Sequence, residues 1–209
     1  MHITVQPKDP ARIVVLASGA GTLLQALLDA ANSATYPAHV VAVGSDRSHA
    51  GALDRAVQAN VPRFVLPMAN YPDRAEWDLA LSDAVAEYQP DLVVLAGFMR
   101  LVGPAFLARF GGRTLNTHPA LLPSFPGAHA VADALAYGVQ VTGSSLIFVG
   151  PGVDDGPILA QVAVPVRPGD DVDVLHERIK QYERTMLVEE VARLVRSGWA
   201  IDDRKVSVP

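Results

Sequence analysis

The chain of 209 residues is long enough for one sizeable hydrophobic core, and half of its residues are hydrophobic. Its formal net charge of −5, with scattered basic residues, excludes the basic patch of a nucleic-acid-binding protein, and the absence of cysteine excludes disulfides and thiolate chemistry. No apolar run approaches the roughly 18 residues of a membrane-spanning helix, so we expect a cytoplasmic protein that binds small molecules rather than membranes or nucleic acid.

The first half of the sequence predicts strands that alternate with helices. We expect a flexible segment at 1–11, a buried strand at 12–18 and, after a glycine loop, a helix. Further strand-like runs are HVVAVGSD, RFVLP and DLVVLAG, and the helical runs between them are AGALDRAVQA and DRAEWDLALSDAVAEY. This alternation predicts an α/β fold, a Rossmann-like open and mainly parallel twisted sheet with helices on both faces.

The second half does not continue the regular alternation of strands and helices. GRTLNTHP predicts one more strand, followed by a proline-rich stretch and a short helix near 129–137. TGSSLIFV and GPILAQVAVPV flank the turn GPGVDDGP and predict a β-hairpin that extends the sheet. A long helix is expected from about 171 to 196, with a buried stripe of Leu175, Ile179, Tyr182, Met186, Val191 and Leu194. We expect a single domain over 12–209.

The first candidate site is the loop SGAGT at 18–22, between the first strand and the first helix. Its glycines let backbone N–H groups approach an anion, and the helix start adds partial positive charge, so a phosphate or carboxylate is the natural ligand. The dinucleotide fingerprint would need a third glycine where Leu24 stands, and no nucleotide-triphosphate loop follows. The alternative is a tight turn that only lets helix and strand pack.

The second candidate site is NTHPALLP, at 116–123. Side chains alternate along a strand, so Asn116 and His118 point to one side and Thr117 to the other. Pro119 keeps His118 out of the helical conformation. At the carboxyl end of a strand the pair could face a substrate carbonyl, with the amide donating to an oxyanion and the imidazole handling a proton. The alternative is a histidine bonded to a nearby carbonyl beside a turn-capping asparagine.

The third candidate site is the turn GVDDGP at 152–157, which holds two acids. Asp-Gly beside proline is first of all a turn signal. If the sheet brings this loop beside His118, a carboxylate would favour the imidazolium form, but the spacing leaves open whether Asp154 or Asp155 does so. The other histidines form no HxH or HExxH pattern and no G-x-S-x-G is present, so neither a metal site nor a serine nucleophile is supported.

Taken together and in this order, the motifs resemble the glycinamide ribonucleotide formyltransferase family, which comprises folate-dependent enzymes of purine synthesis. The resemblance runs from about Ile13 to the end of the last long helix and rests on VVLASGAGTLLQALLDA, DLVVLAGFMRLVGPAFL, LNTHPALLPSFPG and VDDGPILAQ. It implies a catalytic trio of Asn116, His118 and Asp154. It also implies that 10-formyltetrahydrofolate, a co-substrate, gives its formyl group to the amine of 5′-phosphoribosylglycinamide by direct attack, without a metal.

The resemblance also implies where the two substrates bind. A nucleotide-binding half at about 12–110 and a folate-binding and catalytic half at about 111–200 are expected. The ribonucleotide phosphate is expected at Gly21, Thr22, Leu23 and Arg74. The rest of the ribonucleotide is expected between Lys180 and Glu183, where Glu183 accepts hydrogen bonds from the ribose. The folate is expected against Met99, Arg100, Leu101, Val102, Asn116, Gly150, Pro151, Gly152, Val153 and Asp154.

The sequence departs from the family pattern at three positions and leaves two other functions open. Many members have Asn where Leu23 stands, and His where Thr142 and Ile147 stand. The nearest alternative is formyltetrahydrofolate hydrolase, which uses a similar trio with water as the acceptor. From a different class, a dinucleotide-binding oxidoreductase would use Asp46, at the end of the second strand, to hold a ribose hydroxyl. A homodimer is also left open.

Overall fold

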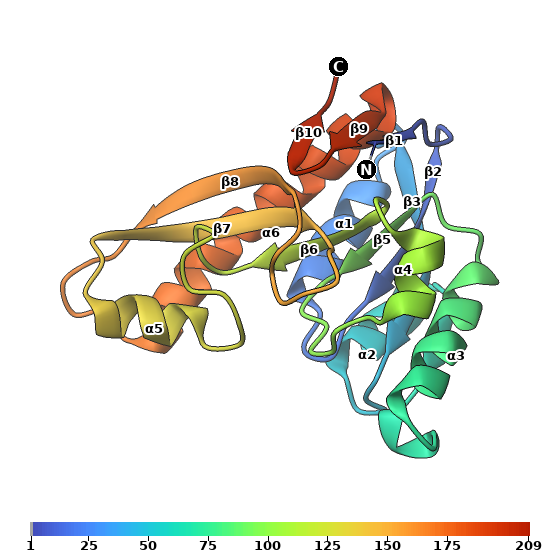
Figure 1. Cartoon of the computed structure of the whole chain (residues 1–209), viewed down its shortest axis with the longest axis horizontal. Helices are drawn as coiled ribbons and strands as arrows, with labels where there is room; N and C mark the ends of the chain where they lie inside the picture. Colours follow the sequence, from blue (N-terminus) through green and yellow to red (C-terminus); the bar gives the residue numbers. More distant parts are fainter. Residues whose placement is uncertain (1) are drawn as a thin grey trace.

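Seven strands form one sheet in the order β4-β3-β2-β5-β6-β7-β8 in the computed structural model, which describes residues 2–209 (Figure 1). The parallel strands are β2 (Ala11–Leu16), β3 (Ala38–Ser45), β4 (Arg63–Val65), β5 (Leu92–Leu95) and β6 (Thr114–His118). The antiparallel hairpin of β7 (Val141–Phe148) and β8 (Ile158–Pro165) extends the sheet beyond β6. The predicted open and mainly parallel sheet with an added hairpin is confirmed.

Helices cover both faces of the parallel strands because the strands are apolar on both sides. On β2, Ile13 and Val15 belong to a core shared with α1 (Thr22–Ala31), α2 (Gly51–Gln58) and α6 (Val172–Ser197). Val14 and Leu16 belong to a second core, shared with α3 (Arg74–Ala86) and α4 (Pro104–Phe110). No helix in residues 2–209 is both long and apolar enough to cross a bilayer.

Helix α4 is absent from the sequence-based prediction, and its start depends on a side chain from another helix. Asp78 of α3 is buried and accepts hydrogen bonds from the backbone N–H groups of Gly103, Ala105 and Phe106 at the beginning of α4. A helix start leaves its first N–H groups without backbone partners, and a carboxylate there also complements the helix dipole. A local sequence pattern cannot reveal a cap supplied from 25 or more residues away.

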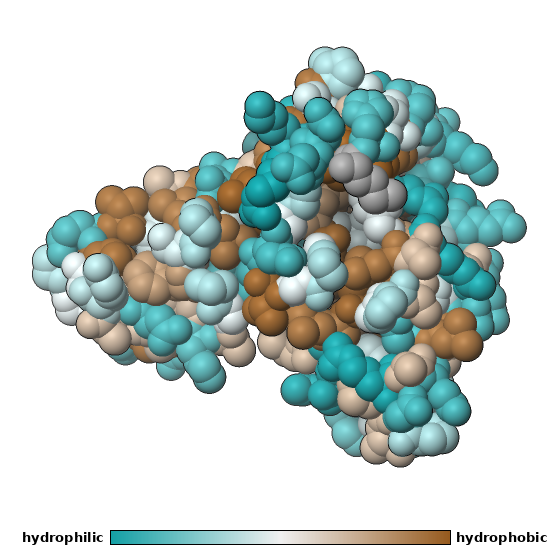
Figure 2. All heavy atoms as spheres, viewed as in Figure 1, coloured by the Kyte–Doolittle hydropathy of each residue, from teal (hydrophilic) through white to brown (hydrophobic). Residues whose placement is uncertain are grey.

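The hairpin projects from the body of the molecule as an arm, together with α5 (Ala130–Tyr137) and the first turns of α6 (Figure 1, left). A small separate core of Val131, Val164, Leu175 and Ile179 packs α5, β8 and α6 together in this arm. On the face shown in Figure 2, hydrophobic residues gather near the middle, where the arm joins the body.

The long helix α6 begins and ends within one residue of its predicted limits, but one residue of its predicted buried stripe, Tyr182, is exposed. Tyr182 is 43% exposed, whereas its neighbour Glu183 is only 4% exposed. The buried positions Leu175, Ile179, Glu183 and Leu187 follow a spacing of four, which is one face of a helix. The polar residue occupies the inner position because Ser144 Oγ donates a hydrogen bond to its carboxylate at 3.0 Å.

A second, three-stranded sheet joins the two ends of the chain. It consists of β1 (His2–Val5), β9 (Trp199–Asp202) and β10 (Lys205–Ser207), with β9 in the middle and antiparallel to both neighbours. The expectation of a flexible segment at 1–11 is therefore wrong for 2–5, and Met1 lies outside the described residues. The partner strand lies almost 200 residues away, so the start of the chain carries little local signal.

Trp199 anchors this small sheet to the main one and should dominate its stability. Its ring is 2% exposed, stacks on Phe148 with 5.9 Å between centroids, and its Nε1–H donates to the Gly112 carbonyl at 2.9 Å. Trp199→Ala should lower the free energy of unfolding by about 3–5 kcal/mol. Trp199→Phe, which keeps an aromatic ring but leaves the carbonyl unpaired, should lower it by about 1–3 kcal/mol. Urea denaturation followed by circular dichroism measures both, and equal losses would contradict the assignment.

Candidate active site

A cavity of about 690 Å³ opens where the order of the strands reverses. From β2 the chain builds outward through β3 and β4, and it then returns to add β5 on the other side of β2. In open α/β sheets, ligands bind at the carboxyl ends of the strands beside this reversal. The cavity is lined by residues of the segments 19–23, 95–102, 116–119 and 147–154, together with Gly127, Ala128, His176, Lys180 and Glu183.

Strand β6 places Asn116 and His118 in this cavity. Asn116 lies opposite Leu95 of β5 and Ile147 of β7, and His118 lies opposite Ser145 of β7. The strand conformation puts both side chains on one side, as expected, and both residues line the cavity. Because Ile147 is apolar, β7 places no titratable side chain directly opposite Asn116.

The imidazole of His118 is buried and has an oxygen atom beside each ring nitrogen. Nδ1 lies 3.2 Å from Asp154 Oδ2, and Nε2 lies 2.8 Å from the carbonyl oxygen of Phe125. The side chain of His118 is 4% exposed and that of Asp154 is 12% exposed. A carbonyl oxygen only accepts hydrogen bonds, so Nε2 carries a proton in this arrangement.

Asp154, rather than Asp155, faces the histidine, which answers the question that the spacing left open. Its Oδ2 also accepts a hydrogen bond from the Gly127 N–H at 2.8 Å, and Asn116 Nδ2 lies 3.4 Å from its Oδ1. Its backbone has φ 50°, in the left-handed region that non-glycine residues seldom adopt. Such conformations persist where surrounding contacts hold them, often at functional sites.

The loop that carries Asp154 is held by its own residues and by the end of the chain. Asp155 Oδ2 accepts from the Gly152 N–H at 3.1 Å, while Arg204 Nη1, in the turn between β9 and β10, donates to the Asp155 carbonyl at 2.9 Å. A Cβ at Gly156 would overlap the Phe148 carbonyl oxygen, so only glycine fits there. The turn is therefore built to keep the carboxylate of Asp154 in place.

The glycine loop begins α1 with exposed backbone donors. Gly21 has φ 72°, and a Cβ there would come within 2.7 Å of the Ala52 backbone, so both the turn and the packing require glycine. Among residues 2–209 no side chain caps the start of α1, and its first N–H groups remain available to an anion. Leu23 packs its side chain into the core.

Helix α6 lines the cavity with three residues one turn apart. Lys180 and Glu183 were expected from the resemblance, whereas His176 was missed. Burial raises the pKa of the Glu183 carboxyl above its usual value, against the opposing hydrogen bond from Ser144. Burial and the nearby charge of Lys180 lower the pKa of His176. The spacing of 176, 180 and 183 on a predicted helix could have indicated His176.

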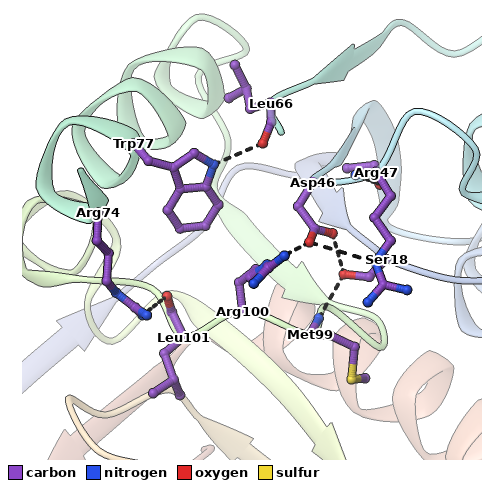
Figure 3. Close-up of polar contacts among 10 residues, drawn as sticks. Ser18, Asp46, Arg47, Leu66, Arg74, Trp77, Met99, Arg100 and Leu101 are labelled. Atoms are coloured by element: carbon purple, nitrogen blue, oxygen red, sulfur yellow. Dashed lines mark hydrogen bonds and ion pairs between the residues drawn. The ribbon is translucent and has the colours of Figure 1, made fainter. Parts of the chain in front are cut away.

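The segment after β5 supplies an apolar wall. Met99 and Leu101 are 60% and 45% exposed, and both line the cavity with Arg100 and Val102. Two of the residues expected to bind substrates do not line the cavity. They are Pro151, in the loop 150–154, and Arg74, at the start of α3. Arg74 instead donates from Nη2 to the Leu101 carbonyl at 2.6 Å (Figure 3). In this structure the Arg74 guanidinium lies beside the apolar wall, and its expected contact with the phosphate stays a prediction.

Asp46 is buried and both of its carboxylate oxygens have partners (Figure 3). Ser18 Oγ donates to Oδ1 at 2.6 Å, and Arg100 Nε donates to Oδ2 at 2.8 Å. This arrangement leaves neither oxygen directed at a dinucleotide ribose, so it weighs against the oxidoreductase alternative. Within residues 2–209, no three His, Asp or Glu side chains are grouped as a metal site requires.

The fold and this site define an α/β enzyme in which an amide, an imidazole and a carboxylate meet at the wall of a ligand cavity. The formyl transferase family profile matches residues 11–191, and the chain belongs to this family. A phosphoribosylglycinamide formyltransferase of Mycobacterium tuberculosis is 57% identical over 206 residues, covering 99% of this chain and 95% of that protein. The Escherichia coli phosphoribosylglycinamide formyltransferase is 41% identical over 174 residues, covering 83% of this chain and 82% of that protein.

A solved structure supports the same assignment of fold and family. The crystal structure of glycinamide ribonucleotide transformylase 1 from Symbiobacterium toebii superposes with a TM-score of 0.92 at 44% sequence identity. The match covers 95% of this chain and 93% of that one, so it spans nearly the whole fold.

The buried carboxyl of Glu183 should give the protein a specific pH dependence. Because the folded chain binds this proton more tightly than the unfolded chain, the stabilisation is complete below the usual pKa of 4.5 and is lost as pH rises through the raised value. The free energy of unfolding of the wild type, relative to Glu183→Gln, should therefore fall as the pH increases. Urea titrations between pH 4 and 8 measure this difference. Glu189→Gln, at an exposed position of the same helix, is the matched control, and a difference independent of pH would contradict the prediction.

Proposed function

We propose that this chain transfers the formyl group of 10-formyltetrahydrofolate to the amine of 5′-phosphoribosylglycinamide, a step of purine biosynthesis. The observation that carries the proposal is the meeting of Asn116, His118 and Asp154 in one cavity, between an anion-binding loop and an apolar wall. The names of the relatives support this choice of substrates. A cytoplasmic location, inferred from the sequence, is part of the proposal.

The ribonucleotide fits the side of the cavity formed by α1 and α6. Its phosphate would accept hydrogen bonds from the backbone of Gly21, Thr22 and Leu23 at the start of α1, where the helix dipole favours an anion. Lys180 lines the same cavity and provides a positive charge. Glu183 would accept from the ribose hydroxyls in addition to the hydrogen bond that it accepts from Ser144 Oγ.

The formyl folate fits the opposite side. A flat aromatic ring system needs an apolar surface with backbone donors and acceptors at its edge. Val102 forms part of that surface, Met99 and Leu101 expose apolar side chains beside it, and the loop at 150–154 supplies backbone groups. This placement puts the formyl carbon near Asn116, between the two binding regions.

The chemistry follows from the position of Asn116. The amine nitrogen attacks the formyl carbon, and the carbonyl oxygen becomes an oxyanion in a tetrahedral intermediate. The amide of Asn116 has two N–H groups, and its one contact, at 3.4 Å to Asp154, leaves a donor for this oxyanion. The bond from the formyl carbon to the folate nitrogen then breaks, and the proton lost by the amine moves to that nitrogen.

His118 and Asp154 support this step through charge. An imidazole that donates to both the Phe125 carbonyl and an ionised Asp154 carries two protons and one positive charge. Held in a buried position, this charge stabilises the oxyanion without requiring a free N–H group. Asp154 orients the imidazole, and through a water molecule it can accept the amine proton and return it to the folate nitrogen.

Removing the amide of Asn116 should abolish most of the activity. Loss of one oxyanion donor typically lowers turnover by about 10²–10³. Asn116→Ala should therefore show this loss in kcat with little change in the KM of either substrate, in a spectrophotometric formyl-transfer assay. Asn70→Ala, at an exposed asparagine outside the cavity, is the control and should retain wild-type turnover. Near-normal kcat for Asn116→Ala would refute its role.

The acceptor distinguishes the transferase from the hydrolase. We expect consumption of 10-formyltetrahydrofolate to require 5′-phosphoribosylglycinamide, because the anion-binding loop and Glu183 hold that acceptor beside the formyl carbon. The measurement is folate consumption with and without the ribonucleotide. Equal rates in both reactions would favour the hydrolase, and thermal stabilisation by NAD but by neither substrate would favour the oxidoreductase.

A further inference from the structure

A buried polar network connects the two ligand-binding sides of the cavity. Ser18 Oγ donates to Asp46 Oδ1 at 2.6 Å and accepts from the Met99 N–H at 2.8 Å. Arg100 Nε donates to Asp46 Oδ2 at 2.8 Å, so a single carboxylate at the end of β3 reaches both neighbours (Figure 3). The side chain of Asp46 is fully buried, and that of Arg100 is 38% exposed.

The residues joined by this network adjoin the two binding segments. Ser18 directly precedes the loop that begins α1, and its backbone N–H donates to the Gly97 carbonyl at 3.1 Å. Met99 and Arg100 begin the apolar wall. These four hydrogen bonds therefore tie the loop after β2 to the loop after β5 across the end of the sheet.

Burying a carboxylate is unfavourable unless its oxygens are paired, and here the pairing is with ligand-binding segments rather than with the core. Arg47, the other nearby cation, is 4.0 Å away and its side chain is 57% exposed, so it contributes little. Asp46 itself does not line the cavity. Its position therefore suits support of the site, not contact with a ligand.

We propose that Asp46 is a positioning residue that, through Ser18 and Arg100, fixes the apolar wall relative to the anion-binding loop so that the folate can bind. This inference rests on the proposed function for the identity of the ligand. Asp46 touches no reacting atom, so its loss weakens binding rather than chemistry. The hydrogen bond from Ser18 and the ion pair with Arg100 can be tested separately. An asparagine at position 46 can still accept from Ser18 but cannot form the ion pair with Arg100.

The test measures the binding of tetrahydrofolate by calorimetry, together with kcat and KM for formyl transfer. Asp46→Asn should raise the dissociation constant of tetrahydrofolate and the KM for the formyl folate about tenfold, as expected for loss of one charged hydrogen bond. We expect kcat and the KM for the ribonucleotide to stay within about twofold. Asp46→Ala, which removes both links, should raise the folate constants further.

Two comparisons separate positioning from a general loss of stability. Asp83→Asn removes an ion pair of 2.6 Å with Arg109, away from the cavity, and should leave all constants unchanged. If Asp46 acts through Arg100, the double variant Asp46→Asn/Arg100→Met should bind tetrahydrofolate no more weakly than Arg100→Met alone. Additive losses would overturn the inference.

The remaining outcomes also decide the question. A dissociation constant for tetrahydrofolate within twofold of wild type in Asp46→Asn would overturn the inference, as would a fall in kcat alone. Failure of the proposed function is visible separately, because the wild type would then bind tetrahydrofolate but would not transfer a formyl group from 10-formyltetrahydrofolate to the ribonucleotide. In that case the calorimetric comparison of Asp46→Asn with the wild type still tests the positioning role.

Discussion

The site depends on the two different pairings of β6. On one edge this strand is parallel to β5, and on the other it is antiparallel to β7. The parallel side places Asn116 beside the apolar segment that follows β5, and the antiparallel side returns the chain so that the hairpin loop carries Asp154 back to His118. A purely parallel sheet would end every strand at the same edge with a helix after it, and it would bring no such loop back.

Three buried carboxylates hold segments that the sheet alone does not fix. Asp78 caps α4, Asp46 connects the loops after β2 and β5, and Glu183 accepts from Ser144 inside the cavity. Each joins elements that are distant in the sequence, and a buried carboxylate whose partners are lost is costly. Buried carboxylates thus fix the start of one helix, the two loops joined by Asp46 and one contact between a helix and a strand, in addition to the apolar packing of helices on the sheet.

Much of this arrangement could be predicted from the sequence because its signals are local. The apolar strands, the long helix and the hairpin have clear periodicity, and the alternation of side chains along β6 placed Asn116 and His118 together. The features that were missed depend on distant partners. Strand β1 pairs with β9, and Asp78 caps α4. Glu183 is buried instead of Tyr182 because Ser144 donates a hydrogen bond to its carboxylate. The hydrogen bond from Arg74 to the Leu101 carbonyl also could not be predicted, because a backbone atom has no sequence signature.

The contact from Arg204 to the Asp155 carbonyl extends the active site to the carboxyl end of the chain. β9 also pairs with the first strand of the chain, so the small sheet that joins the two ends contacts the loop that carries Asp154 through Arg204. An affinity tag or a truncation at the carboxyl end would reach this loop, although the end lies outside every motif in the sequence. We therefore expect the position of Asp154 to be sensitive to changes at the ends of the chain.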